Sequence, residues 1–111
     1  MYSKKVLSLL DNINSTDFLP SKTVLKQVKI GEGMQQIIIA CDDNRYYFAA
    51  IGSPYLLAMG KWLKDNLQQG TWMKIKDYQI TDLVEYFSLP EHKRQDALLI
   101  LNLIEQLNLN A

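Results

Sequence analysis

The chain has 111 residues, of which 12 are basic and 12 acidic, so its formal net charge is zero. This length predicts a single domain over residues 1–111. Balanced charge gives no electrostatic attraction for nucleic acid or anionic membrane, so neither is expected as a partner. No run approaches the roughly 20 apolar residues of a membrane span, and the first residues lack a signal peptide, so a cytoplasmic location is expected. The single cysteine, Cys41, excludes an internal disulfide and a zinc site of several thiolates.

The first half of the chain predicts one helix followed by three strands. Apolar residues recur at helical spacing over residues 2–13, which is typical of a short amphipathic helix. Turn-forming residues follow. Segments 23–30 and 34–41 are rich in Val and Ile and flank a glycine-containing turn, and an aromatic-rich segment, 45–51, follows a second turn. This pattern predicts a three-stranded antiparallel meander.

A longer helix is predicted after the sheet. Ser53 is a favourable N-cap, Pro54 suits the first helical position, and Gly70 suits the C-terminal end. Residues 72–79 are expected to form an irregular connector or a short helical turn. The apolar face of the helix comprises Leu56, Met59, Trp62, Leu63 and Leu67.

Two more helices with a Leu-Pro corner between them are predicted at the C-terminal end. Thr81 is the expected N-cap of the first, which should end near Ser88. Ser88 and Glu91 have the spacing of a capping box for the second, and Pro90 falls in its first turn. The whole pattern predicts an α+β fold with one helix before the sheet and three or so helices packed on one face after it. The apolar stripe of the last helix comprises Ala97, Leu98, Ile100, Leu101, Ile104 and Leu107.

Motifs that would identify an enzyme are absent from the sequence. It contains no glycine-rich phosphate loop, no nucleophile elbow and no His-Glu-x-x-His. His92 is the only histidine and is expected to be solvated beside Lys93 and Arg94. Cys41 is expected to behave as a small buried hydrophobic residue. The residues alone therefore predict an α+β domain without a catalytic centre.

Five segments, taken in order, are similar to motifs of one known family. They are Tyr2-Ser-Lys-Lys-Val6, Gly31-Glu-Gly-Met34, the stretch 47–64 that ends in Gly60-Lys-Trp-Leu-Lys64, Ile80-Thr-Asp-Leu83 and Leu89-Pro-Glu-His-Lys93. Each segment is unspecific alone, but their order and spacing together resemble the NifU/IscU-type iron–sulfur cluster assembly scaffold family. The resemblance covers nearly the whole chain, with Glu32 at the place of a family Asp. The fold that it implies is the α+β arrangement that the residue pattern predicts separately.

The resemblance also implies where a cluster site would lie. The family holds a nascent [2Fe–2S] cluster with three cysteines, helped by an Asp and a His, and soft thiolates suit iron and sulfide. In this chain the corresponding positions are Ile30, Glu32, Ala49, Gln95 and Asp96. Every thiolate is replaced, and only acidic character remains at Glu32 and Asp96. No cluster or other cofactor is therefore expected.

Two functions follow from this departure, and the first is favoured. In the first, the chain keeps the fold as a protein-binding module that docks on a cysteine desulfurase, an Hsp70-type chaperone or an unrelated machine. In the second, it takes part in cluster assembly and holds iron or zinc transiently through Glu32, Asp96 and ligands supplied by a partner. Oxygen ligands favour harder ions, which argues against the second. An enzyme using Glu32 and Asp96 as an acid–base pair is a third, least favoured alternative.

The segment Leu89-Pro90-Glu91-His92-Lys93 is a candidate partner-binding site. The similar Leu-Pro-Pro-Val-Lys segment of the family is a docking peptide for an Hsp70-type chaperone. Here Glu91 and His92 place polar groups at its apolar centre, so a weaker chaperone contact is expected. Alternatively, the Leu-Pro pair only forms the corner before the last helix, with Leu89 packed as a staple.

Overall fold

A computed structural model describes residues 2–18, 26–42 and 44–109. It confirms the predicted α+β fold, in which a helix precedes a three-stranded antiparallel sheet of order β1-β2-β3 and further helices follow. Among the described residues, no helix is both long enough and apolar enough to cross a membrane. The elements in chain order are α1 (Lys4–Asp11), β1 (Lys26–Glu32), β2 (Gln35–Asp42), β3 (Arg45–Ile51), α2 (Pro54–Gln69), α3 (Trp72–Ile75), α4 (Ile80–Phe87) and α5 (Arg94–Leu109).

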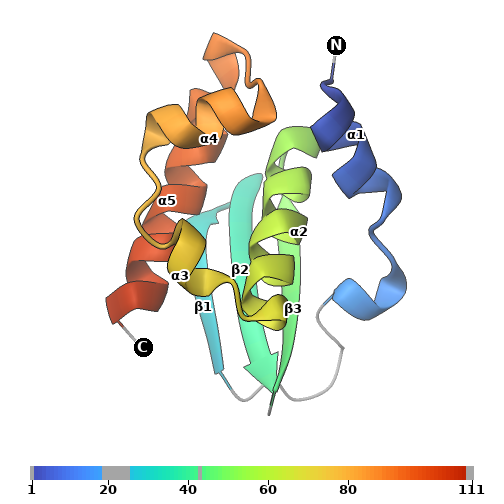
Figure 1. Cartoon of the computed structure of the whole chain (residues 1–111), viewed down its shortest axis with the longest axis vertical. Helices are drawn as coiled ribbons and strands as arrows, with labels where there is room; N and C mark the ends of the chain where they lie inside the picture. The colour runs from blue at the N-terminus through green and yellow to red at the C-terminus, as the bar shows by residue number, and fades with distance from the viewer. Residues whose placement is uncertain (1, 19–25, 43, 110–111) are drawn as a thin grey trace.

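The two long helices cover one face of the sheet (Figure 1). Helix α2 packs against β3 and helix α5 packs against β1, while α1 lies on α2 and α4 on α5. A glycine sets the distance between α2 and the sheet. A Cβ at Gly60 would lie 2.8 Å from the Phe48 ring and 2.9 Å from the Ile37 side chain, so only glycine permits this approach.

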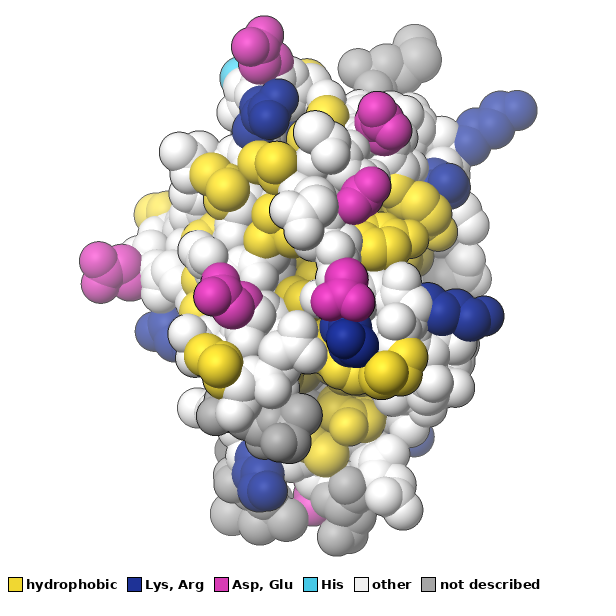
Figure 2. Space-filling view, turned by 60° about the vertical axis from the view of Figure 1, so that its left-hand side comes forward, with side chains coloured by type: hydrophobic (Ala, Val, Ile, Leu, Met, Phe, Trp, Pro, Cys, Tyr) yellow, Lys and Arg dark blue, Asp and Glu magenta, His cyan; other side chains and the backbone are white. Residues whose placement is uncertain are grey.

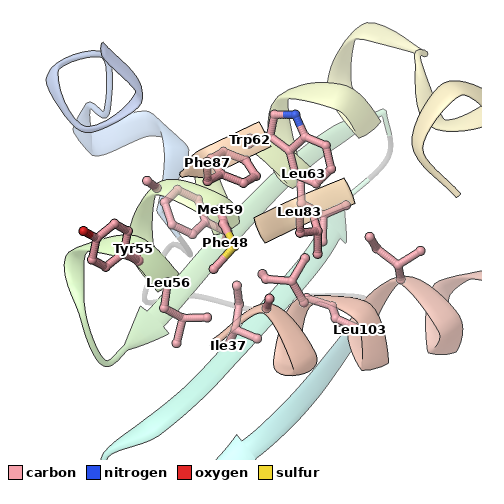
Figure 3. Close-up of a cluster of buried hydrophobic side chains, with 14 of the residues drawn as sticks. Ile37, Phe48, Tyr55, Leu56, Met59, Trp62, Leu63, Leu83, Phe87 and Leu103 are labelled. Carbon is pink, nitrogen blue, oxygen red and sulfur yellow. The ribbon is translucent and has the colours of Figure 1, made fainter. Parts of the chain in front are cut away.

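Side chains from the sheet and from α2, α4 and α5 form one core (Figure 3). Phe48, Leu63 and Leu103 are fully buried there. Trp62 lies at one side, with its ring centroid 5.3 Å from that of Phe87 and 5.6 Å from that of Tyr78. The predicted apolar face of α2 is confirmed: four of its five residues are buried and Leu67 is partly buried.

The predicted ends of α2 are also confirmed. The Ser53 hydroxyl accepts a hydrogen bond from the backbone N–H of Leu56, and Pro54 occupies the first turn. Gly70 ends the helix in the left-handed conformation with φ of 77°. A short helical turn then follows as α3, which is one of the two forms expected for this connector.

The hairpin turn between β1 and β2 differs from the prediction. Gly31 and Glu32 belong to β1, where they pair with Gln36 and Gln35, so the turn moves to Gly33 and Met34. The paired strands therefore extend further than the Val- and Ile-rich segments. The predicted start of this strand, residues 23–25, lies outside the described residues.

Two predicted caps in the C-terminal part are wrong. Helix α4 begins at Ile80 rather than after Thr81, because the Asp82 carboxylate accepts a hydrogen bond of 2.7 Å from the backbone N–H of Gln79. Ser88 does not cap the last helix; it ends α4 in the left-handed conformation with φ of 53°. A 3₁₀ turn over Glu91–Lys93 then leads into α5.

The apolar stripe of α5 is confirmed except at Leu98. This side chain is 41% exposed, whereas Leu103, which was not expected in the stripe, is fully buried. Ala97, Ile100 and Ile104 are buried as predicted. Positions 97, 100, 103, 104 and 107 follow one helical face, and Leu98 lies off that face.

The segment before the sheet carries a short 3₁₀ turn, Ser15–Asp17, within the stretch that was predicted to be irregular. Phe18 then forms a single parallel bridge with Phe48 at the edge of β3 that does not pair with β2. The centroids of the two rings lie 5.2 Å apart. Residues 19–21 of the predicted irregular stretch lie outside the described part of the chain.

Candidate binding site around Asp96

Asp96 is a buried carboxylate at the start of α5. It is 2% exposed. One of its oxygens accepts a hydrogen bond of 2.7 Å from the Gln35 side-chain amide, and the other accepts one of 2.5 Å from the Ser53 hydroxyl. These two donors come from the start of β2 and the start of α2. Asp96 therefore ties the β1–β2 hairpin, α2 and α5 together at one end of the fold.

The Ser53 hydroxyl has two roles at this site. It accepts the backbone N–H of Leu56 as the N-cap of α2 and donates its own proton to Asp96. A hydroxyl can do both at once, and a negative charge near a helix N-terminus is stabilised by the helix dipole. The sequence identified the N-cap role of Ser53 but not its bond to Asp96, and it gave no signal for Gln35.

The structure brings Glu32 to the same end of the fold. Glu32 is exposed at the end of β1, and its backbone pairs with that of Gln35, whose side chain binds Asp96. Gln95, the neighbour of Asp96 in the chain, is exposed. Ile30 is partly buried on the helix-covered face, where it pairs with Ile37.

Ala49 is not on the same face as Ile30 and Glu32. It pairs with Ile38, whereas Ile37, the partner of Ile30, pairs with Ala50. Because successive strand residues project to opposite faces, Ala49 points away from the helices. The five positions implied by the resemblance are thus not all brought together.

Cys41 lies far along β2 from Gln35, in register with Lys26 and Tyr46. It is only partly buried, so its expected behaviour as a buried hydrophobic residue holds only in part. Cys41 and Asp96 are at opposite ends of the sheet. Within residues 2–18, 26–42 and 44–109, no three His, Cys, Asp or Glu side chains are placed to hold a metal ion together.

The candidate partner-binding segment is a folded corner. Leu89 is 7% exposed, and its backbone N–H donates to the carbonyl of Val84 across the end of α4. Glu91 and His92 are exposed, as expected for His92. Leu89 therefore packs in the core, which agrees with the staple alternative, and the segment would have to open before an extended-peptide groove could bind it.

A second group of charged side chains, the Asp17 cluster, joins the segment before the sheet to α2. It comprises Asp17, Lys61, Lys64 and Asp65. Asp17 is 2% exposed and lies 2.6 Å from the ammonium of Lys64 and 3.1 Å from that of Lys61. Asp65 pairs with the same two lysines at 3.1 and 3.5 Å. Three buried charges and the partly exposed Asp65 thus balance one another, and the sequence pattern did not reveal them.

The Asp17 cluster alters proton affinities. Burial alone would raise the pKa of Asp17, but hydrogen bonds from Lys64, the backbone N–H of Asn14 and Lys61 outweigh it, and the pKa falls to about 2. Burial alone would lower the pKa of Lys61, but its hydrogen bonds to Asp17 and Asp65 raise it instead. Both shifts keep Asp17 and Lys61 ionised at neutral pH.

The arrangement at Asp96 is therefore a hydrogen-bonded junction with an exposed carboxylate, Glu32, close by. Its chemistry suits recognition and structural support: among the described residues no thiolate lies at this end, and His92 is exposed in the 3₁₀ turn that leads into α5. No protein-family model matches the chain, and no curated protein matches it.

Proposed function

We propose that the chain is a protein-binding module built like the NifU/IscU-type scaffolds, without a cluster site of its own. The order of helix, three-stranded sheet and following helices supports this proposal, as do the five family-like segments. The observation that carries it is the pair of hydrogen bonds from Gln35 and Ser53 to Asp96.

These bonds occupy both oxygens of the one buried acid in the region. A metal ion at Asp96 would compete with these two donors for the lone pairs of a carboxylate that is 2% exposed, and each hydrogen bond that it displaced would be a cost to the fold. The carboxylate of Asp96 is a hard ligand, whereas iron–sulfur clusters are held mainly by soft thiolates. Asp96 therefore stabilises the fold at a position where the family has a cluster ligand.

A transient iron or zinc site at Glu32 is the second candidate. Glu32 is exposed beside Gln35 and is open to ligands from another protein. This arrangement could hold an ion only while a partner is docked.

The same end of the sheet carries exposed apolar side chains that suit docking. Met34 in the hairpin turn is 84% exposed, and Ile51 at the end of β3 is 46% exposed. Large exposed apolar groups near one another favour protein contact. A cysteine desulfurase is the partner that we propose for this end.

Anaerobic reconstitution tests the loss of the cluster. The purified chain is incubated with iron, sulfide and a cysteine desulfurase, desalted, and examined by visible absorbance and iron analysis, with a cysteine-containing scaffold of the family as the positive control. We expect no retained iron or sulfide. A stoichiometric cluster would refute the proposal, and its loss in a Glu32→Gln variant would favour the second candidate.

Calorimetric titration with the desulfurase tests the binding function. We expect Met34→Asp to weaken binding by about tenfold, which corresponds to about 1.4 kcal/mol. Met73→Asp is the matched control, because Met73 is 72% exposed but lies on α3. Absence of binding by the unchanged chain, or equal weakening by both variants, would rule out this docking surface.

A further inference from the structure

A hollow opens between the sheet and the C-terminal ends of the long helices, at the end of the fold remote from Asp96. Its volume is about 870 Å³, which lies in the range typical of small-molecule sites. Figure 2 shows hydrophobic side chains exposed in a recess in the lower half of that face. The hollow is separate from the proposed docking end, and the inference drawn from it does not depend on the proposed function.

The floor of the hollow is the helix-facing side of the sheet. Backbone pairing aligns Lys26, Cys41 and Tyr46 across the three strands, and the next row contains Val28 and Ile39. Residues paired in one row project from the same face. Lys26, Cys41 and Tyr46 thus form a polar row beside an apolar floor.

The walls are apolar side chains from three helices. Leu67 comes from α2, Trp72 from α3 and Leu107 from α5, and all three are only partly buried. Gly70 lies between the first two, and a Cβ placed on it would meet no atom within 4 Å. Apolar surface therefore remains open to water here, and a ligand that covered it would gain hydrophobic stabilisation.

The polar row carries positive charge and hydrogen-bond donors. Lys26 is exposed, and it is the one charged side chain among the described residues that line the hollow. Burial raises the pKa of Tyr46, and its contact with Cys41 raises it further, so the phenol keeps its proton at neutral pH. An ammonium and a phenol O–H at one rim suit an anionic head group.

We propose that this hollow binds a small carboxylate with an apolar body, such as a medium-chain fatty acid. The carboxylate lies at the rim beside Lys26 and Tyr46, and the chain packs on Val28, Trp72 and Leu107. The sheet and the three helix ends enclose the hollow on several sides, so its shape suits a compact ligand better than a peptide strand or a second copy of the chain.

Titration of the full chain with decanoate tests this proposal. Trp62 is 6% exposed in the core, so a saturable change in tryptophan emission reports chiefly on Trp72. We expect decanoate to produce this change and decyltrimethylammonium to bind at least about tenfold more weakly, because the polar row carries a positive charge. Backbone amide NMR should place the shifts at Val28 and Ile39.

Lys26→Gln is the test of the head-group site. It should weaken decanoate binding by about fivefold, as expected for an exposed charge, and leave decanol binding unchanged. Lys29→Gln is the matched control, because Lys29 is an exposed lysine of the same strand on the opposite face, where it pairs with Ile38.

Four results would overturn the proposal. They are no saturable response below the micelle concentration, equal binding of the anionic and cationic ligands, equal loss in the two lysine variants, and amide shifts confined to residues that do not line the hollow. A fifth result would also reject it: sedimentation that shows dimers, together with loss of decanoate binding as the dimer forms.

Discussion

Asp17 ties the segment before the sheet to α2 through two ion pairs. Its carboxylate lies between the ammonium groups of Lys61 and Lys64 at 3.1 and 2.6 Å. Asp17→Asn should lower the free energy of unfolding by about 3 kcal/mol, because two buried lysines would then share only Asp65. Urea denaturation measures this loss.

Asp77→Asn is the control for that variant. Asp77 pairs with Lys76 at 3.2 Å, but its side chain is 84% exposed. Exposed pairs contribute little, so the change should stay below about 0.5 kcal/mol. Equal losses in the two variants would show that the Asp17 cluster does not have the stabilising role argued above.

The free energy of unfolding should depend on pH through Asp17. The pKa of Asp17 is about 2 in the folded chain against 3.8 for an ordinary Asp. Because folding lowers this pKa, ionised Asp17 stabilises the fold at pH values above the pKa of the unfolded chain. Its contribution to the free energy of unfolding is therefore complete above about pH 4 and is lost as the pH falls toward 2. Its size is about 2 kcal/mol. Urea denaturation across this pH window should show the fall in the free energy of unfolding in the unchanged chain and not in Asp17→Asn. An equal dependence of the two free energies on pH would contradict this role of Asp17.

The bond between Ser53 and Asp96 can be measured by a double-mutant cycle. Ser53→Ala alone should cost about 1 kcal/mol through the lost N-cap, in addition to the lost bond. Combining it with Asp96→Ala should give a coupling energy of about 1–2 kcal/mol, because the two side chains are in direct contact. Ser53→Ala combined with Asp77→Ala should be additive. A coupling near zero for the first pair would contradict the role given to Asp96.

At the scale of elements, the end of α4 contains a strained residue. Ser88 has φ of 53°, a conformation that glycine adopts without cost. Ser88→Gly should raise the free energy of unfolding by about 0.5 kcal/mol. Ser8→Gly within α1 should lower it by about 0.5 to 1 kcal/mol. Thermal or urea unfolding that gave both changes the same sign would contradict this assignment.

The corner between α4 and α5 predicts a weak chaperone contact. Leu89 is packed in the core and Glu91 and His92 are exposed, so the segment offers neither an extended backbone nor an apolar centre. The variant Glu91→Pro/His92→Val should stimulate the ATPase of an Hsp70-type chaperone more than the unchanged chain does. Equal stimulation would count against the idea, and matched urea curves would check that both proteins are folded.

At the scale of the whole molecule, the sequence predicted the order of elements because hydrophobic period and turn residues are local signals. Ser53 and Gly70 marked the ends of α2 correctly for this reason. Thr81 and Ser88 were misassigned because several residues nearby could cap, and tertiary packing and the Asp82 carboxylate decided between them. A one-dimensional pattern does not contain that competition.

The candidate site was predictable only in part. The resemblance singled out Asp96, but its partners Gln35 and Ser53 lie 61 and 43 positions away in the chain. The face of Ala49 follows from strand register, and the hollow beside Tyr46 follows from where α2 and α5 end and α3 begins. Each of these depends on contacts between distant segments, which periodicity and motif spacing do not specify.

The two outer strands of the sheet also bear on aggregation. Phe18 bridges to the outer side of β3, and β1 presents the exposed lysines Lys26 and Lys29. A short covering segment and a charged edge both discourage another chain from adding a strand. The two outer strands are therefore protected against fibre-like self-pairing by different means, β3 by a covering segment and β1 by charge.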